Sequence, residues 1–456
     1  MLKKYLTYAF FLLAPAVAMG QETVQEFNLS DTLTLKESIQ IGLKNNRTLK
    51  KAILDEEKAK YQRNEIRGSG LPQFSAYGQY NNFLDVFPQA VPGGIFGGGN
   101  PNDIEVISLG VPQSLKAGFE LNQLIFSNSY LIGLKAAKTG EEFYHILAQQ
   151  SEEDVIREIS MNYLGVIQLE LQKENLLANI DQLGSLEKIL QSQYENDLAR
   201  KVDLNRVRVN LTSIKSELEN LEISIYQQEG YLKLLMGIPV DTEINLDQSI
   251  ADSDQIIKAF EIQGFNILDR KDIQVLGVQK QLYDYEYKNI KAAHQPQLVG
   301  FADFNKNAFS QDFDFMSQNK VWYQGFLIGL KLQIPIFDGM QTKYKAAQSK
   351  VNAQQLSLDR LQAEDAAELE YKNALNKYYN SLSTLRSLDG NLDLADEVLQ
   401  ETTLLYKEGL SPLTDLLDAE TTQRQAQANY NNQIIQVRIA QLEILNSTGK
   451  ITNLLL

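Results

Sequence analysis

The sequence contains no cysteine among its 456 residues and only two histidines, His145 and His294. Without cysteine there is no disulfide framework, so packing or the association of chains must stabilise the fold. The two histidines lie far apart, and we find no nucleophile–base pair, no metal-ligand cluster and no phosphate-binding loop. The glycine-rich stretch GGIFGGGN is typical of a flexible loop. We therefore expect no catalytic residues, no metal site and no cofactor, and the protein is predicted not to be an enzyme.

After residue 21 the sequence also lacks any uncharged apolar run of the roughly 20 residues that a membrane-spanning helix needs. Residues 1–20 contain two lysines, a short apolar run and a small-residue cleavage pattern. This pattern predicts a secretory signal peptide, and a retained anchor is less favoured because the run is short. With no cysteine after it, a lipid anchor at that point is excluded. We expect the protein to leave the cytoplasm, and a β-barrel is the other structure that satisfies backbone groups in lipid.

Positive charge is scarce relative to negative charge. The full sequence has a net charge of −15, and removal of the two lysines of the signal peptide makes it −17. An acidic chain of this kind repels nucleic acid, and no basic aromatic patch argues otherwise. We expect no nucleic-acid partner.

Proline is absent from residues 127–195, which predicts one nearly continuous helix of about 100 Å at 1.5 Å per residue. Over residues 204–235, apolar side chains recur at alternating three- and four-residue steps, broken only at Gln228, as in a coiled coil. A similar seam covers 388–406, and a returning helix is predicted over 413–445. That helix contains AETTQRQAQANYNNQ, which fits either a wet bundle interior or a solvated outer face.

The sequence repeats itself at a displacement of 212 residues. YENDLARKVDLN and YKEGLSPLTDLLDAE share a frame, in which Tyr194 matches Tyr406 (406 − 194) and Asp203 matches Asp415 (415 − 203). Two tandem halves are the economical interpretation. The predicted division is residues 1–20 signal peptide, 21–237 first repeat, 238–270 linker, 271–449 second repeat and 450–456 tail. Hairpin tips are predicted at 196–202 and 408–414.

Four stretches alternate apolar and polar side chains, at residues 71–82, 115–126, 296–305 and 323–336. Such strands are typical of a transmembrane barrel, although a half-buried antiparallel sheet has the same alternation and is commoner. The barrel is favoured because long loops lie on one side of the strands and very long helices on the other. Four strands cannot close a barrel in lipid, so several chains must pool their strands.

Together these features resemble the TolC/OprM family of trimeric outer-membrane efflux ducts. The resemblance runs from about Leu33 to Gly449 and rests on the tandem halves, the strands after Pro72 and Pro296, the IFSN and IFDG junctions and the two helical turns. It implies a mixed, mainly α fold with long antiparallel coiled-coil helices and four transmembrane strands per chain. Three chains would form a 12-stranded β-barrel (three times four) and an α-helical periplasmic tunnel with an equatorial belt.

The resemblance also implies a pore gate. Tyr406 lies where family members carry a gate tyrosine, and Asp415 and Asp418 match the paired aspartates of the pore ring. Ser411 stands where the best-known member has a gate-bridging arginine, and the sequence does not decide whether another arginine substitutes. The candidate partners from the first copy are Tyr194, Arg200, Asp203 and Arg206.

Asp415 and Asp418 lie one helical turn apart on one face. Threefold symmetry would turn them into six carboxylates around a narrow axis, which repel one another and favour cations. For Asp415 the alternative is a role at the start of the helix, where an acid is favourable.

The implied function is a passive exit duct for small molecules or peptides, in a tripartite efflux pump or a type I secretion system. Its expected partners are two further copies in a homotrimer, outer-membrane lipid, a periplasmic adaptor and an inner-membrane pump of the RND or ABC type. The expected docking residues at the tips are Asn196, Asp197, Leu198, Ala199, Gly409, Leu410, Ser411 and Pro412. The expected location is the bacterial outer membrane, with the helices in the periplasm. The alternative is a periplasmic coiled-coil adaptor or scaffold without a pore.

Overall fold

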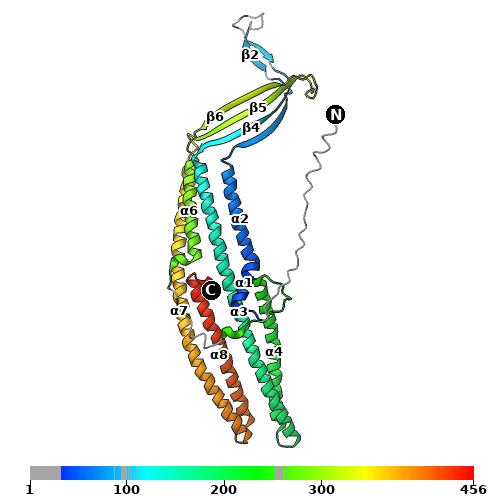
Figure 1. The fold of residues 1–456 in the computed structure, drawn as a ribbon, viewed down its shortest axis with the longest axis vertical. Coiled ribbons are helices and arrows are strands. Elements are labelled where there is room, and N and C mark those ends of the chain that lie inside the picture. The colour runs from blue at the N-terminus through cyan, green and yellow to red at the C-terminus, as the bar shows by residue number, and fades with distance from the viewer. Residues whose placement is uncertain are drawn as a thin grey trace.

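The computed structural model describes residues 32–455 except 87, 94–99, 101, 103, 109, 252–259 and 263. The predicted signal peptide lies outside the described residues. A curved antiparallel sheet occupies one end of an elongated molecule, and long helices run from it to the other end (Figure 1). The fold is thus mainly helical with antiparallel strands at one end, as the sequence predicted.

The sheet has four strands in the order β1 (Gln73–Asn82), β4 (Gln113–Ser127), β5 (Gln297–Ser310) and β6 (Tyr323–Gln333). All neighbouring strands are antiparallel. The sequence predicts 323–336 for the last strand, but β6 ends at Gln333, which pairs with Gln297, the first residue of β5. Beyond this pair stand Pro296 and Pro335, which have no N–H to donate to a ladder.

A second, two-stranded sheet was not predicted. It consists of β2 (Pro88–Pro92) and β3 (Ile104–Ser108), which form an antiparallel hairpin within the long loop between β1 and β4. β2 begins and ends with proline, which is uncommon within strands, so the sequence does not indicate a strand here. The hairpin projects beyond the main sheet, away from the helices (Figure 1).

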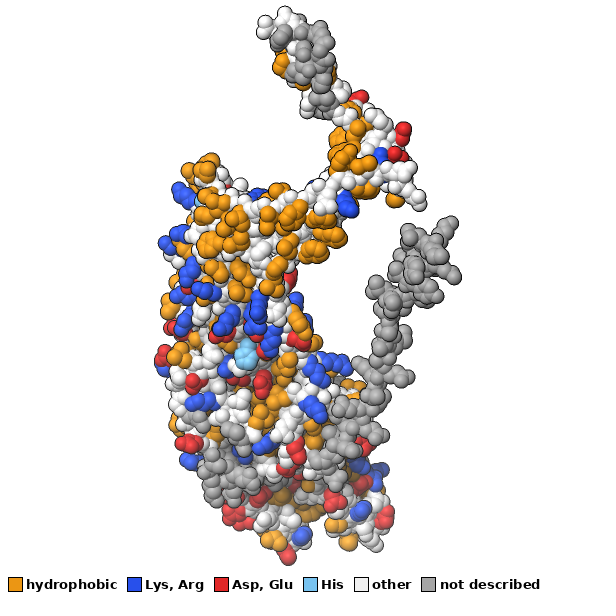
Figure 2. All heavy atoms as spheres, turned by 45° about the horizontal axis from the view of Figure 1, so that its top comes forward, with side chains coloured by type: hydrophobic (Ala, Val, Ile, Leu, Met, Phe, Trp, Pro, Cys, Tyr) orange, Lys and Arg blue, Asp and Glu red, His pale blue; other side chains and the backbone are white. Residues whose placement is uncertain are grey.

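The main sheet has one apolar face and one polar face. On the apolar face Phe119 pairs with Phe304, which in turn pairs with Phe326 in the next strand. On the polar face the Tyr77 hydroxyl donates a 2.6 Å hydrogen bond to Asp303. Hydrophobic side chains gather over the sheet (Figure 2), and in β6 Ile328 is 73% exposed. The apolar face is therefore uncovered in the single chain.

Two helical hairpins form most of the rest. The first consists of α3 (Asn128–Glu195) and α4 (Lys201–Met236), and the second of α7 (Gln341–Lys407) and α8 (Leu413–Ser447). The continuous helix predicted over 127–195 is confirmed; Ser127 caps it by accepting a bond from the Tyr130 N–H. The coiled-coil seam of α4 is buried against leucines of α3.

The remaining helices surround the middle of the molecule. They are α1 (Leu35–Asn45), α2 (Arg47–Gly68), α6 (Lys271–Ala292) and the 3₁₀ turns Gln248–Ala251, Ile267–Asp269 and Ile451–Leu455. The largest apolar core lies here and joins α1, α3, α4, α8 and the C-terminal turn. Its centre is Tyr163, fully buried, whose hydroxyl lies 2.9 Å from the Leu33 carbonyl oxygen and 2.8 Å from that of Asp247. None of the helices in the described part of the chain is long and apolar enough to cross a membrane.

Candidate functional site

The two hairpins end side by side, at the end of the molecule farthest from the sheet (Figure 1). The first turns at Asp197 (φ 58°) and the second at Gly409 (φ 73°), and the next residues, Leu198 and Leu410, are 80% and 76% exposed. Glycine adopts positive φ without strain, and aspartate is among the few other residues that tolerate it. Both pairs are 212 residues apart (409 − 197 and 410 − 198), so the two tips have equivalent turns.

Asp415 and Asp418 are exposed on the first two turns of α8, next to the second tip. The N-cap of this helix is Pro412, which makes no side-chain capping bond, and Asp415 is the third helical residue. The Asp415 carboxylate accepts a 3.0 Å bond from the Ser411 hydroxyl instead of capping backbone N–H groups. Asp415 is thus favourably placed in the first turn, near the positive end of the helix dipole, but is not the cap.

Leucines on the opposite side of α8 anchor this segment to the first hairpin. Leu413, Leu416 and Leu417 are buried in the same cluster as the seam of α3 and α4. Packing one face of α8 against the first hairpin leaves the aspartates on the free face. The position of the two acids is therefore fixed by core packing between the hairpins.

Tyr406 lies at the end of α7, half-buried against the same leucine cluster. Burial raises the pKa of the Tyr406 hydroxyl, and the nearby carboxylate of Asp203 raises it further. Asp203 is itself buried at the start of α4, although its match in the second copy, Asp415, is exposed. The electrostatic interaction between Tyr406 and Asp203 links one residue from each predicted gate segment.

The two candidate arginines differ in their surroundings. Arg200 donates bonds of 2.8 and 3.3 Å to the Asp203 carboxylate, three residues along the chain. The Arg206 side chain is exposed and, like the Tyr194 side chain, makes no hydrogen bond or ion pair with other described residues. Within the described chain neither arginine contacts Asp415 or Asp418.

One acid near the tips escaped the sequence analysis. Glu420 of α8 is only 9% exposed and accepts a 3.0 Å bond from the Gln182 side chain of α3. Burial raises the pKa of the Glu420 carboxyl, although the Gln182 bond and the charge of Arg424 oppose this. Glu420 follows the buried Leu416 and Leu417 by four and three residues, so the helical period places it on the packed face of α8 although it is an acid.

The polar stretch of α8 forms bonds between helices. Gln423 donates a 2.8 Å bond to Asp396 of α7, and Gln433 donates a 3.0 Å bond to the Ser381 carbonyl. Asn432 accepts a 3.0 Å bond from Gln168 of α3. These residues join α8 to both neighbours, so the stretch is neither a purely solvated face nor an unpaired interior.

Comparison with known proteins agrees with this arrangement. Residues 267–450 match the family model described as outer membrane efflux protein. The outer membrane protein TolC of Salmonella enteritidis is 21% identical over 437 residues, which cover 92% of this chain and 83% of that protein. The CmeC outer membrane channel of Campylobacter jejuni has the same fold, with a TM-score of 0.69, 18% identity and coverage of 91% of this chain and 85% of that one. The open state of the Neisseria gonorrhoeae MtrE outer membrane channel also has this fold, with a TM-score of 0.69 and 18% identity. The alignment covers 91% of this chain and 88% of that one.

A curved sheet with an uncovered apolar face, set on two long helical hairpins, is the fold that this chain shares with these outer membrane channels. Residues 267–450 match the outer membrane efflux protein family, and the chain as a whole is similar to TolC/OprM-like outer membrane proteins.

Proposed function

We propose that the chain is one protomer of a trimeric exit duct, which passively conducts small molecules or peptides across the outer membrane. The observation that carries this proposal is the open sheet. In the described chain, β1 and β6 are each paired on one side only, and the apolar face is exposed. An unpaired edge is not stable in lipid, and three copies of four strands, joined β6 to β1, would form a closed barrel of 12.

The helices would continue this barrel as a tunnel. The two halves of the chain, 21–237 and 271–449, act in this proposal as tandem repeats, because each contributes two strands of the main sheet followed by a long helical hairpin. The region between them would form part of the belt around the tunnel. A scaffold without a pore would need no sheet with an uncovered apolar face.

The exposed aspartates of α8 would line the narrow end of the tunnel. Six carboxylates from three chains would concentrate cations there and would hold back anions. Tyr406 and Asp203 would connect the two hairpins of each chain beside this ring. Outward movement of α7 and α8 would then have to separate the leucine contacts between the hairpins, so the closed entrance is held by packing.

The hairpin tips would receive a periplasmic adaptor, which links the duct to an inner-membrane pump of the RND or ABC type. Leu198 and Leu410 support this assignment because they are large, apolar and exposed in equivalent turns. Exposed apolar residues within a polar rim are typical of sites for protein partners.

Two experiments test the proposal. The purified protein, reconstituted in planar bilayers, is expected to form trimers that conduct ions; folded trimers without conductance would contradict the duct. Since the chain has no cysteine, Leu198→Cys and Leu410→Cys each introduce a unique cross-linking site. Both are expected to capture an adaptor in cells, whereas Leu84→Cys, 93% exposed at the sheet end, is the matched control and should capture none. Equal capture at all three positions, or none at the tips, would contradict the docking assignment.

A further inference from the structure

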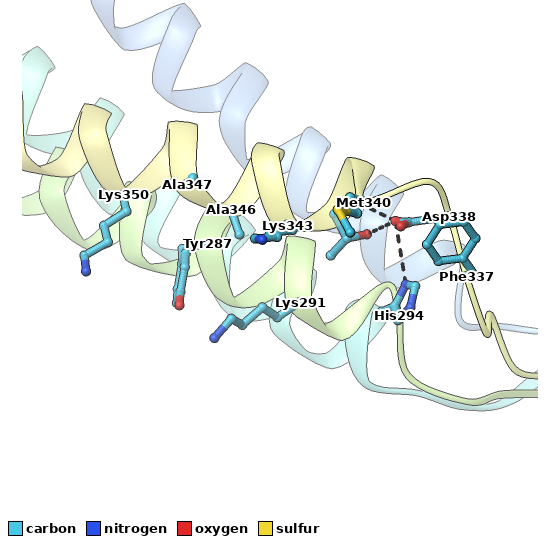
Figure 3. Close-up of a pocket in the computed structure, with 11 residues that line it drawn as sticks. Tyr287, Lys291, His294, Phe337, Asp338, Met340, Lys343, Ala346, Ala347 and Lys350 are labelled. Carbon is cyan, nitrogen blue, oxygen red and sulfur yellow. Dashed lines mark hydrogen bonds and ion pairs between the residues drawn. The ribbon is translucent and has the colours of Figure 1, made fainter.

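A groove with three lysines lies between α6 and α7, directly below the sheet. It has a volume of about 550 Å³, within the range typical of small-molecule sites. Lys291 comes from α6, and Lys343 and Lys350 come from α7, about two turns of the helix apart. Figure 3 shows the three side chains along the groove, with His294 and Asp338 at the end near the strands.

Small residues make the space between the helices. Ala346 and Ala347 line the groove on the α7 side, and Ala346 is buried. The Lys291 ammonium lies 4.7 Å from the centre of the Tyr287 ring, a cation–π contact that leaves its N–H groups free to donate. The groove therefore has aliphatic and aromatic walls.

The positive charge of this groove is not balanced by its own carboxylate. Asp338 accepts a 2.9 Å bond from the Thr342 N–H and a second bond from the Thr342 hydroxyl, which hold the Asp338 pKa below its usual range. Its remaining ionic neighbour is His294, at 3.8 Å. Among the described residues, none forms an ion pair with Lys291, Lys343 or Lys350.

Apolar residues connect the groove to the sheet. Phe337, 78% exposed, and Met340 line it, and Ile336, 91% exposed, lies four residues from the groove-lining Met340 and three from the end of β6. On the face shown in Figure 2, hydrophobic side chains cover the sheet and lysine and arginine side chains lie below it. This spatial arrangement, an apolar band with basic residues next to it, is typical of a membrane boundary.

We propose that the groove binds the phosphate group of an anionic phospholipid in the periplasmic leaflet, with the acyl chains over Phe337 and the apolar face of the sheet. Lysine donates to phosphate as a compact charge, and basic pockets between helices at a membrane boundary bind anionic head groups. The lipid would hold α6 and α7 together at the point where the barrel joins the tunnel. The inference rests on the orientation in the membrane given by the proposed function.

The test uses the purified trimer in detergent, with phosphatidylglycerol or phosphatidylcholine of identical acyl chains, and native mass spectrometry to measure the two dissociation constants. The wild type should prefer phosphatidylglycerol, and Lys291→Gln/Lys343→Gln/Lys350→Gln should lose about tenfold or more of that preference, because each lysine near a lipid surface contributes about fivefold. The control is Lys188→Gln/Lys215→Gln/Lys280→Gln, which removes three exposed lysines outside the groove and should keep the preference.

Three results would overturn the proposal. The first is equal retention of both lipids by the wild type, and the second is an unchanged preference in the variant without the three lysines. The third is displacement of the lipid by glycerol 3-phosphate at equal concentration, which would indicate a site for free phosphate. Single-channel conductance of the same preparations separates this inference from the duct. Channels with no lipid preference contradict the lipid site alone, and folded trimers without channels contradict the duct.

Discussion

The Ser411 hydroxyl donates a 3.0 Å hydrogen bond to the carboxylate of Asp415, four residues later, at the start of α8. The bond holds the acid beside the tip without neutralising it. One candidate cation in the first hairpin, Arg200, is already paired with Asp203 at 2.8 Å. Within one chain, Asp415 and Asp418 are thus exposed acids without a basic partner among the described residues.

A cation introduced beside Asp415 should weaken the proposed acidic ring. Ser411→Arg would place a guanidinium within reach of the Asp415 carboxylate and would halve the net charge of a six-acid ring, from six to three. We expect lower cation selectivity and a smaller conductance in planar bilayers. Ser216→Arg, at an exposed position on α4, is the control and should conduct as the wild type does. An unchanged selectivity in Ser411→Arg would show that Asp415 does not face the pore.

The leucine contacts between the hairpins should hold the tips closed. Leu416 is 4% exposed and packs in the cluster shared by α3, α4 and α8. Leu416→Ala should destabilise this contact by about 2–5 kcal/mol, lower the melting temperature of the protein and increase its conductance. Leu410→Ala makes the same chemical change at an exposed tip and should leave both quantities unchanged. A Leu416→Ala protein with wild-type conductance would show that the closed entrance does not depend on this packing.

The long helices and the strands were predictable because their periodicities are local properties of the sequence. The α4 seam and the alternation in β6 can be counted without knowing any partner. The β2–β3 hairpin could not be predicted, because Pro88 and Pro92 are residues that disfavour a strand assignment. The repeat located Asp203 and Asp415 at equivalent positions, but tertiary packing buries the first and exposes the second.

The groove with three lysines could not be predicted from the sequence either, for a different reason. Lys291 and Lys343 are 52 residues apart (343 − 291), in helices separated by two strands. Their proximity depends on how β5 and β6 turn the chain back on itself. Local patterns carry no information on such pairs.

Stability should depend on pH through Glu153 of α3. Burial raises the pKa of its carboxyl to about 7, while Lys271 opposes this and the acids Asp154, Asp272 and Glu152 add to it. In the unfolded chain the carboxyl titrates near 4.5, so the folded state holds a proton between about 4.5 and 7 that the unfolded state has lost. Stability from this group is therefore present below about pH 4.5 and is lost as the pH rises towards 7.

Glu153→Gln keeps the shape of the protonated acid and cannot ionise. We expect it to raise the stability of the protein by about 1–2 kcal/mol at pH 8, after allowance for solvent screening, and to have almost no effect at pH 4.5. Thermal unfolding followed by circular dichroism at both pH values measures the difference. Glu158→Gln, an exposed position on the same helix, should show no such trend. A gain for Glu153→Gln that is equal at both pH values would contradict the assignment.

The middle of the molecule should be sensitive to loss of one hydroxyl. Tyr163 is fully buried, and its hydroxyl is shared between the carbonyl oxygens of Leu33 and Asp247. Tyr163→Phe leaves those acceptors without this donor and should cost about 1–3 kcal/mol. Tyr226→Phe, 70% exposed on α4, should have no effect on the melting temperature. Equal melting temperatures for all three proteins would show that the hydroxyl does not stabilise this core.

In the proposed function, the exposed acids of α8 form the selective entrance of a trimeric duct. Single-channel recording in planar bilayers, comparing the wild type with Asp415→Ala/Asp418→Ala, measures whether they do. We expect small, cation-selective currents in the wild type, and larger currents without selectivity in the variant. Wild-type conductance and selectivity in a folded, trimeric variant would contradict it.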